Sequence, residues 1–175
     1  MIHKLYDASK VEACMDRTDL AQDGGASPGT QAIEHDLAVL VRALEGLYRS
    51  RKYPLERAQY LLLLALREGA RPSGDLAAML ALDHSTVTRQ LAALEKGGLI
   101  ARRPNPLDGR SALIEATAAG LARCAEMQAL RLSRLEEMLA DWSEPERQRF
   151  AADIARFNAQ VMGRSRTARE EPGLG

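Results

Sequence analysis

The sequence predicts a mainly α-helical (α+β) chain that carries one short β-hairpin, on three observations. Hydrophobic residues make up 46% of the 175 residues, which is enough to build a packed core. Aromatic residues make up only 4%, whereas Ala, Leu, Arg and Glu are frequent, and this composition favours helices by intrinsic propensity. Apolar residues recur every three or four positions along most of the chain, and one stretch after Gly98 departs from this spacing.

The N-terminal region divides into an arm and a helix. Residues 1–30 have weak periodicity and end in the Gly-rich run Asp23–Gly29, so they are expected to form a flexible arm. Residues 31–53 are expected to form a helix, because their apolar residues are spaced by four and three positions and share one stripe. This coiled-coil-like stripe consists of Ile33, Leu37, Leu40, Leu44 and Leu47.

Three helices are predicted next. Pro54 is expected to open the first, whose leucines at positions 61–64 are apolar on every side and should be buried. Ser73, after Pro72, can cap a short second helix, and Asp83 can cap a third that runs to Gly97. About three residues separate the second helix from the third.

A hairpin and two longer helices complete the pattern. Residues 99–103 and 112–116 read as short strands joined by a Pro- and Gly-containing loop. Thr117 can cap the next helix, and the run Ser143–Glu146 matches a capping box that opens the last one. Residues 164–175 are expected to form a flexible tail.

The helix from His84 to Lys96 carries the first functional signal. Val87, Leu91 and Leu94 fall within about 60° of one another on a helical wheel and should face the core. The opposite side is small, polar and basic, as a helix needs to be if it enters a DNA major groove. An ordinary solvent-exposed helix face is the alternative interpretation of this helix alone. The residues on the outer side are Ser85, Arg89, Ala92 and Lys96, and those on its flanks are Thr86, Thr88 and Ala93.

The order of the elements strengthens this signal. A short helix, a tight turn, a second helix and a hairpin form the arrangement of a winged helix-turn-helix, with the hairpin as a two-stranded wing. Arg110 lies beside Gly109 at the hairpin tip, where it can project toward a minor groove, and Arg102 and Arg103 lie at the base. Asp108 either pairs with Arg110 as a surface contact or orients it toward DNA. Although the formal net charge of the chain is zero, residues 84–111 hold five basic and two acidic side chains, an excess of 5 − 2 = 3.

Over about residues 32–163 the chain resembles the MarR family of bacterial transcriptional regulators. Each matching piece is common by itself, and the combination is specific. The matching pieces are Ser73–Ala77, Asp83–Ile100, Arg102-Arg103, Asp108-Gly109-Arg110 and Thr117–Gly120.

The resemblance implies a homodimer in which the first, fifth and sixth helices of the two subunits interleave. Residues 31–53 and 119–163 would then form the dimerisation domain, and residues 54–118 the winged helix-turn-helix DNA-binding lobe. The implied interface residues lie on the two apolar stripes: Ile33, Leu37, Leu40, Leu44, Phe150, Ile154, Phe157 and Val161.

The resemblance also implies a sequence-specific regulator that binds double-stranded DNA, in the family's usual form a repressor released by a small molecule. Two-fold symmetry predicts an inverted-repeat operator with half-sites roughly 34–36 Å apart. The DNA-binding candidates are Ser73, Ser85, Thr86, Thr88, Arg89, Lys96, Arg102, Asp108 and Arg110.

Two further kinds of site follow from the family. Members often bind small aromatic molecules between the dimer helices and the lobe, and Tyr48, Tyr53 and Tyr60 are the candidates here, with a purely structural role as the alternative. Some members sense oxidants through a cysteine. Cys124 falls on an inward stripe where a buried, inert thiol is the usual case, and Cys14 lies in the arm.

Several function classes lack support in the sequence. The cysteines and histidines have no zinc-ligand spacing, and no cofactor is expected. No apolar run approaches the ~20 residues of a membrane span, and no secretory signal is evident, so a cytoplasmic location is expected. No nucleophile elbow, Gly-rich phosphate loop or paired carboxylates indicate an enzyme. The remaining alternative is a winged-helix protein-interaction module or antagonist that does not bind DNA, against which the local basic excess argues.

Overall fold

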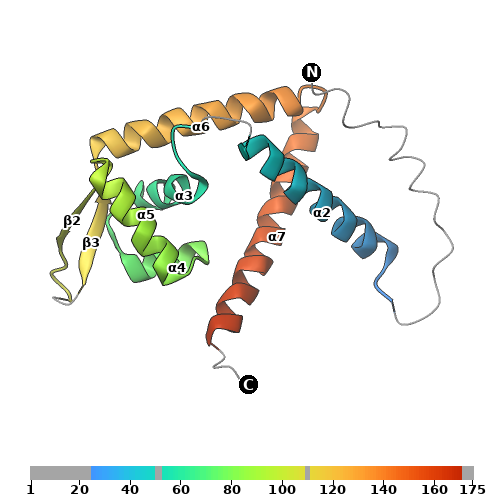
Figure 1. Cartoon of the computed structure of the whole chain (residues 1–175). Helices are drawn as coiled ribbons and strands as arrows, with labels where there is room; N and C mark the ends of the chain where they lie inside the picture. The colour runs from blue at the N-terminus through green and yellow to red at the C-terminus, as the bar shows by residue number, and fades with distance from the viewer. Residues whose placement is uncertain (1–24, 50–52, 109–110, 171–175) are drawn as a thin grey trace. The chain divides into compact units, whose positions relative to one another are not determined.

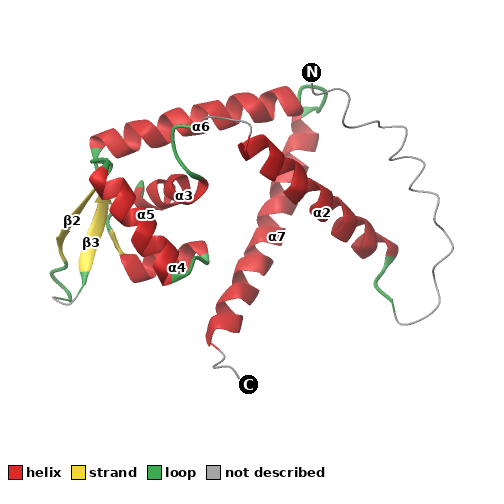
Figure 2. Ribbon diagram, viewed as in Figure 1, coloured by secondary structure: helices red, strands yellow, loops and turns green. Residues whose placement is uncertain are grey.

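The computed structural model describes residues 25–49, 53–108 and 111–170, with side chains for 25–46, 53–108 and 111–164. The chain divides into two compact units, residues 1–51 and residues 52–175. Most of the described residues lie in helices, and one small sheet accompanies them (Figures 1 and 2). The mainly α-helical class with a β-hairpin is therefore confirmed.

The first unit contains one described helix, α2 (Pro28–Arg49). The Ser27 hydroxyl oxygen accepts a hydrogen bond of 3.2 Å from the backbone N–H of Thr30, and Pro28 occupies the first turn, where its missing N–H costs nothing. The helix therefore starts inside the segment expected to be an arm, and residues 1–24 of that arm lie outside the described residues. Ile33 and Leu40 on the apolar stripe are 56% and 47% exposed, and Leu37 and Leu44 are half-buried.

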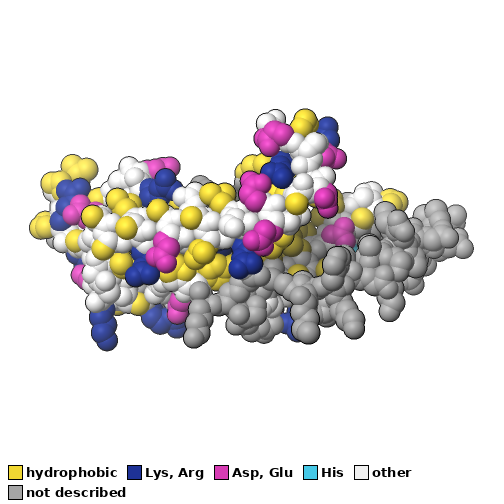
Figure 3. Space-filling view, turned by 90° about the horizontal axis from the view of Figure 1, so that it is seen from above, with side chains coloured by type: hydrophobic (Ala, Val, Ile, Leu, Met, Phe, Trp, Pro, Cys, Tyr) yellow, Lys and Arg dark blue, Asp and Glu magenta, His cyan; other side chains and the backbone are white. Residues whose placement is uncertain are grey.

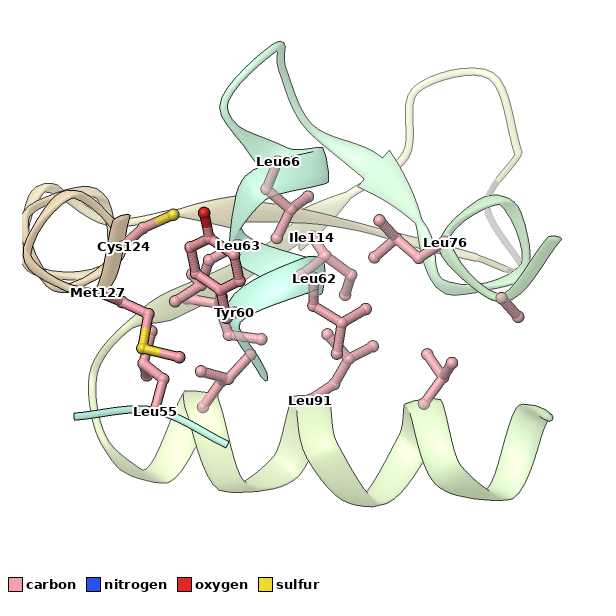
Figure 4. Close-up of a cluster of buried hydrophobic side chains, with 14 residues drawn as sticks. Leu55, Tyr60, Leu62, Leu63, Leu66, Leu76, Leu91, Ile114, Cys124 and Met127 are labelled. Atoms are coloured by element: carbon pink, nitrogen blue, oxygen red, sulfur yellow. The ribbon is translucent and has the colours of Figure 1, made fainter. Parts of the chain in front are cut away.

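The core of the second unit lies among α3 (Arg57–Leu66), α4 (Ser73–Leu80), α5 (His84–Lys96), the sheet and the first turns of α6 (Ala118–Met138). Within the four-leucine run of α3, Leu62 and Leu63 are fully buried, and Leu61 and Leu64 are half-buried against the cluster. Figure 4 shows this cluster, to which α6 contributes Cys124 and Met127. The predicted burial of this helix on several sides is confirmed.

The start of α3 differs from the prediction. The helix begins at Arg57 rather than at Pro54. The Gln59 side chain accepts a hydrogen bond of 3.2 Å from the backbone N–H of Glu56, which fixes Glu56 as the capping residue. The carboxamide three residues into the helix, rather than the proline, marks where the helix begins.

The sheet has three antiparallel strands in the order β1 (Arg71–Pro72), β3 (Ala112–Ala116), β2 (Ile100–Pro104). The two predicted hairpin strands are confirmed, and Arg102 lies opposite Ile114 in their register. The third strand, β1, was not predicted, because two residues carry no alternation. Pro72 is tolerated there because an edge strand does not need every N–H. As a result, Ser73 is the first residue of α4, and Pro72, not Ser73, holds the capping position.

A tight turn joins α4 to α5. Ala81 has a φ of 51°, a left-handed conformation that ends α4, and the backbone N–H of Leu82 donates a 3.1 Å bond back to Ala77. Asp83 then caps α5, as predicted, by accepting a 2.7 Å hydrogen bond from the backbone N–H of Thr86. This short connection fixes α5 directly after α4.

Both C-terminal helices begin at the predicted caps. The Thr117 hydroxyl accepts a bond of 3.1 Å from the Gly120 N–H and donates one of 2.8 Å to the Gly98 carbonyl, which ties α6 to the start of the wing. Glu146 accepts a 2.7 Å bond from the Ser143 N–H at the start of α7 (Glu144–Glu170). This last helix extends through most of the expected tail. No helix in the described ranges has the length and hydrophobicity that a bilayer crossing requires.

Candidate nucleic-acid interface

The first turn of α5 is organised by an ionised carboxylate. One oxygen of Asp83 accepts bonds from the Ser85 hydroxyl (2.6 Å) and the Thr86 N–H (2.7 Å), and the other accepts the Thr86 hydroxyl (2.7 Å). These hydrogen bonds, led by the one from Ser85, hold the pKa of Asp83 far below its usual range. The carboxylate therefore remains charged at neutral pH, on the exposed side of the helix start.

The inner face of α5 is packed as predicted. Val87, Leu91 and Leu94 are each 1% exposed. Gln90 is also buried, at 8% exposure, and its amide nitrogen donates a 2.9 Å bond to a Glu56 carboxylate oxygen at the start of α3. The sequence analysis missed Gln90, although its place three residues after Val87 and four before Leu94 puts it on the inward stripe.

The outer face of α5 presents the predicted polar side chains to solvent. The exposed side chains are those of Ser85, Thr88, Arg89 and Lys96. Thr86 is half-buried, and its hydroxyl donates a hydrogen bond to Asp83. Among the described residues, neither Arg89 nor Lys96 forms an ion pair. The guanidinium of Arg89 is thus available in full to an external acceptor.

The base of the wing is held by ion pairs. Arg102 Nε lies 2.8 Å from a Glu95 carboxylate oxygen at the end of α5, and Arg103 Nε lies 3.0 Å from a Glu115 oxygen across the hairpin. Both pairs are about half exposed, so they contribute little to stability. The Arg102–Glu95 pair links the wing to α5, and the Arg103–Glu115 pair links the two strands of the wing. Together they neutralise two of the cations that gave this segment its basic excess.

The tip of the wing is built around Asn105. Its side-chain oxygen accepts a 3.0 Å bond from the Leu107 N–H, and its side-chain nitrogen donates a 2.8 Å bond to the Ser111 hydroxyl. Leu107 is 95% exposed at this tip, a feature that the sequence analysis did not single out. Asp108 is exposed, and Arg110 lies outside the described residues. The alternative roles of Asp108 toward Arg110 both stay predictions.

The remaining candidate residues have diverse surroundings. Ser73 is half-buried at the start of α4. Tyr60 is only 7% exposed, with the Arg131 guanidinium 5.2 Å from its ring centre, which favours a structural role. Tyr53 is half-buried against the core, and the side chain of Tyr48 lies outside the described residues.

Cys124 is fully buried, and burial raises the pKa of its thiol. Since the thiolate is the reactive form, this supports the predicted inert thiol. Cys14 lies outside the described residues. In the described ranges no group of three His, Cys, Asp or Glu side chains is placed to hold a metal ion.

Large apolar side chains remain exposed on α2, α6 and α7. Figure 3 shows one face on which hydrophobic side chains are interspersed with acidic and basic ones. On α7 the four residues of the predicted interface stripe are between 42% and 44% exposed: Phe150, Ile154, Phe157 and Val161.

Comparison with known proteins places this geometry in a family. A family model described as "MarR family" matches residues 53–111. An uncharacterized HTH-type transcriptional regulator of Bacillus subtilis, YxaD, is 40% identical over 131 residues, which cover 73% of this chain and 92% of that protein.

Solved structures share the fold. A mutant of E. coli MarR complexed with operator DNA superposes with a TM-score of 0.57 at 21% identity, covering 78% of this chain and 99% of that one. Bordetella bronchiseptica BpsR, whose DNA binding is described as regulated by 6-hydroxynicotinic acid, superposes with a TM-score of 0.61 at 23% identity, covering 73% and 98%. At these identities the likeness concerns the fold.

Proposed function

Because the chain belongs to the MarR family of HTH-type transcriptional regulators, we propose that it binds double-stranded DNA sequence-specifically through α5 and the wing. One observation carries this proposal. The outer face of α5 combines small polar residues with an Arg89 that no described acidic side chain neutralises. An arginine presented this way can bind guanine O6 and N7 with two parallel hydrogen bonds.

The other predicted residues fill supporting roles in the proposal. Thr88 and Lys96 flank Arg89 and would contact phosphates, as would Ser73 from the start of α4. Arg110 would enter a minor groove from the wing tip, with Asp108 orienting it. Arg102 would act differently from a free cation that contacts DNA. Its side chain pairs with Glu95 and would hold the wing in position.

We also propose that the working unit is a homodimer with residues 54–118 as the DNA-binding lobe and residues 31–53 and 119–163 as the dimerisation region. The exposed apolar stripes of α2 and α7 support this, because a protein rarely leaves so many large apolar side chains in water. A two-fold dimer would bind an inverted repeat with half-sites roughly one helical turn apart.

Regulation by a small aromatic effector is proposed by analogy with BpsR, whose DNA binding is described as regulated by 6-hydroxynicotinic acid. An effector that favours a lobe spacing unsuited to two successive grooves would release DNA. With an operator that overlaps a promoter, the protein would then act as a repressor that the effector relieves. Of the tyrosine candidates, half-buried Tyr53 is better placed than Tyr60 to accept a ligand. We further propose that the protein is non-enzymatic and acts in the cytoplasm.

Selection from a random duplex library tests the proposal. The full chain is expected to enrich an inverted repeat, with binding that weakens steeply as salt rises, because phosphate contacts release counterions. A chain that enriches no duplex at low salt would contradict the proposal and favour the protein-interaction alternative.

A further inference from the structure

We propose that Ser85 reads a base carrying an exocyclic amine, adenine or cytosine, and that Asp83 imposes this choice by holding the Ser85 hydroxyl proton. This inference rests on the proposed function, in which α5 lies in a major groove. It adds the class of base that the first turn of the helix recognises.

The direction of the hydrogen bond between the two residues follows from chemistry. The Ser85 oxygen lies 2.6 Å from a carboxylate oxygen of Asp83. An ionised carboxylate has no proton to give, so the hydroxyl must be the donor. Because the proton is committed to a short, charge-assisted bond, the hydroxyl oxygen offers only lone pairs to the exterior.

Only a hydrogen-bond donor on DNA can bind the lone pairs of the Ser85 hydroxyl oxygen. In the major groove guanine presents two acceptors, and thymine presents one acceptor and a methyl group. Adenine N6 and cytosine N4 alone carry hydrogens that can be donated there. A phosphate only accepts, and it would also be repelled by the charge of Asp83 on the same exposed turn. The amine of adenine or cytosine is therefore the group that matches Ser85.

The neighbouring side chains have the opposite requirement. Arg89 lies one helical turn after Ser85 on the same face and can only donate, which suits guanine. Thr88 is exposed, and within the described ranges its hydroxyl has no partner that would hold its proton. Thr88 can therefore donate to a phosphate, and it provides a matched control for Ser85.

The experiment removes one amine at a time from the duplex that the full chain selects from a random library. Each adenine is replaced by purine and each cytosine by 2-pyrimidinone, and Kd is measured for the wild type, Ser85→Ala and Thr88→Val. At one position in each half-site, loss of the amine should weaken wild-type binding about 3- to 10-fold, the worth of one hydrogen bond. Ser85→Ala should be insensitive to the same change, whereas Thr88→Val should keep the wild-type sensitivity.

Asp83→Asn gives an independent arm. Asparagine caps helices as well as aspartate does, so the helix should form, and thermal unfolding of the variant checks this. The neutral amide holds the Ser85 proton less firmly. In Asp83→Asn, the ratio of Kd for duplexes with guanine or thymine at that position to Kd for duplexes with adenine or cytosine should therefore be smaller than in the wild type.

Two results would overturn the inference while DNA binding by the family fold stands. One is an equal loss for the wild type and Ser85→Ala at every amine removed. The other is a sensitivity to amine removal that Thr88→Val loses as fully as Ser85→Ala does. If no duplex is selected at all, the proposed function fails, and this inference fails with it.

Discussion

At the scale of the residue, Arg89 is the side chain on which sequence discrimination should depend most. Arg89→Ala should reduce discrimination at one base position per half-site by ~1–3 kcal/mol, because the bidentate contact to guanine is lost. Kd measured on a panel of single-base operator variants checks this. Arg89→Lys, which keeps the charge without the planar fork, should lose the same discrimination. A uniform loss across the panel would remove Arg89 from base reading.

Arg110 should act through charge rather than through base identity. Arg110→Ala should weaken binding to all duplexes. It should also make the negative slope of log K against log salt shallower by about one unit. Arg110→Lys keeps the charge and should keep the slope. Titrations at several salt concentrations provide the measurement, and a slope that does not change in Arg110→Ala would take this residue out of the contact set.

The Cys124 thiol should be unreactive at neutral pH, and the stability of the fold should fall as the pH rises into the alkaline range. Burial raises the pKa of its thiol, so its contribution to stability is present below the ordinary thiol pKa of 9.0 and is lost as the pH rises beyond it. In a Cys14→Ser background, iodoacetamide should label Cys124 slowly at neutral pH, and peroxide should leave DNA affinity unchanged. Fast labelling of the folded protein would contradict a buried thiol.

Residue-level prediction from the sequence succeeded where helical spacing decides burial. Val87, Leu91 and Leu94 are inward because a helix repeats every 3.6 residues. The pairing of Arg102 with Glu95 could not be predicted, because it forms only when the strand after α5 folds back along the helix.

At the scale of the element, Gly120 fixes how closely α6 approaches the wing. A Cβ at this position would lie 2.0 Å from the Leu99 carbonyl oxygen, so Gly120→Ala should destabilise the fold by at least ~1–3 kcal/mol despite the better helix propensity of alanine. Gly74→Ala in α4 is the matched control, since nothing lies within 4 Å of the added Cβ. Urea unfolding of both variants tests this, and equal stabilities would contradict the close approach.

Thr117 should matter as much through the wing as through its helix. Thr117→Ala removes both the cap of α6 and the bond to the Gly98 carbonyl, so a loss of about 1–2 kcal/mol is expected. Thr117→Ser keeps the hydroxyl and should recover most of that free energy of unfolding. Thermal unfolding compares the two variants, and equal losses would show that the hydroxyl is not responsible.

Element boundaries were predictable where a cap is written in the local sequence. Asp83, Thr117 and Ser143 each marked a helix start correctly, because their side chains or backbones bond within three residues. Strand β1 was missed because its two residues are defined by pairing with a distant strand. The local sequence therefore does not predict that pairing.

At the scale of the whole molecule, the exposed stripe of α7 should be covered by a second copy of the chain. Ile154→Glu should produce a monomer, because Ile154 is 42% exposed in the single chain and a charge there would be buried in the dimer. Ala152→Glu lies on the opposite side of α7 and should leave the dimer intact. Sedimentation equilibrium measures both, and an unchanged mass for Ile154→Glu would place the interface elsewhere.

The fold of the lobe was predictable from the order of its elements, because a short helix, a tight turn, a helix and a hairpin leave few arrangements that bury one core. The arrangement of two chains was implied only by family resemblance. A single sequence shows which faces are apolar, as in Ile33 and Phe157, but not which surface covers them.

Sedimentation velocity of the full chain with a labelled duplex, chosen by selection from a random library, tests the central claim most directly. The account predicts a complex of two chains on one duplex at low salt, and its dissociation as the salt concentration rises. A duplex that sediments unchanged at saturating protein, or a complex with a single chain, would contradict it.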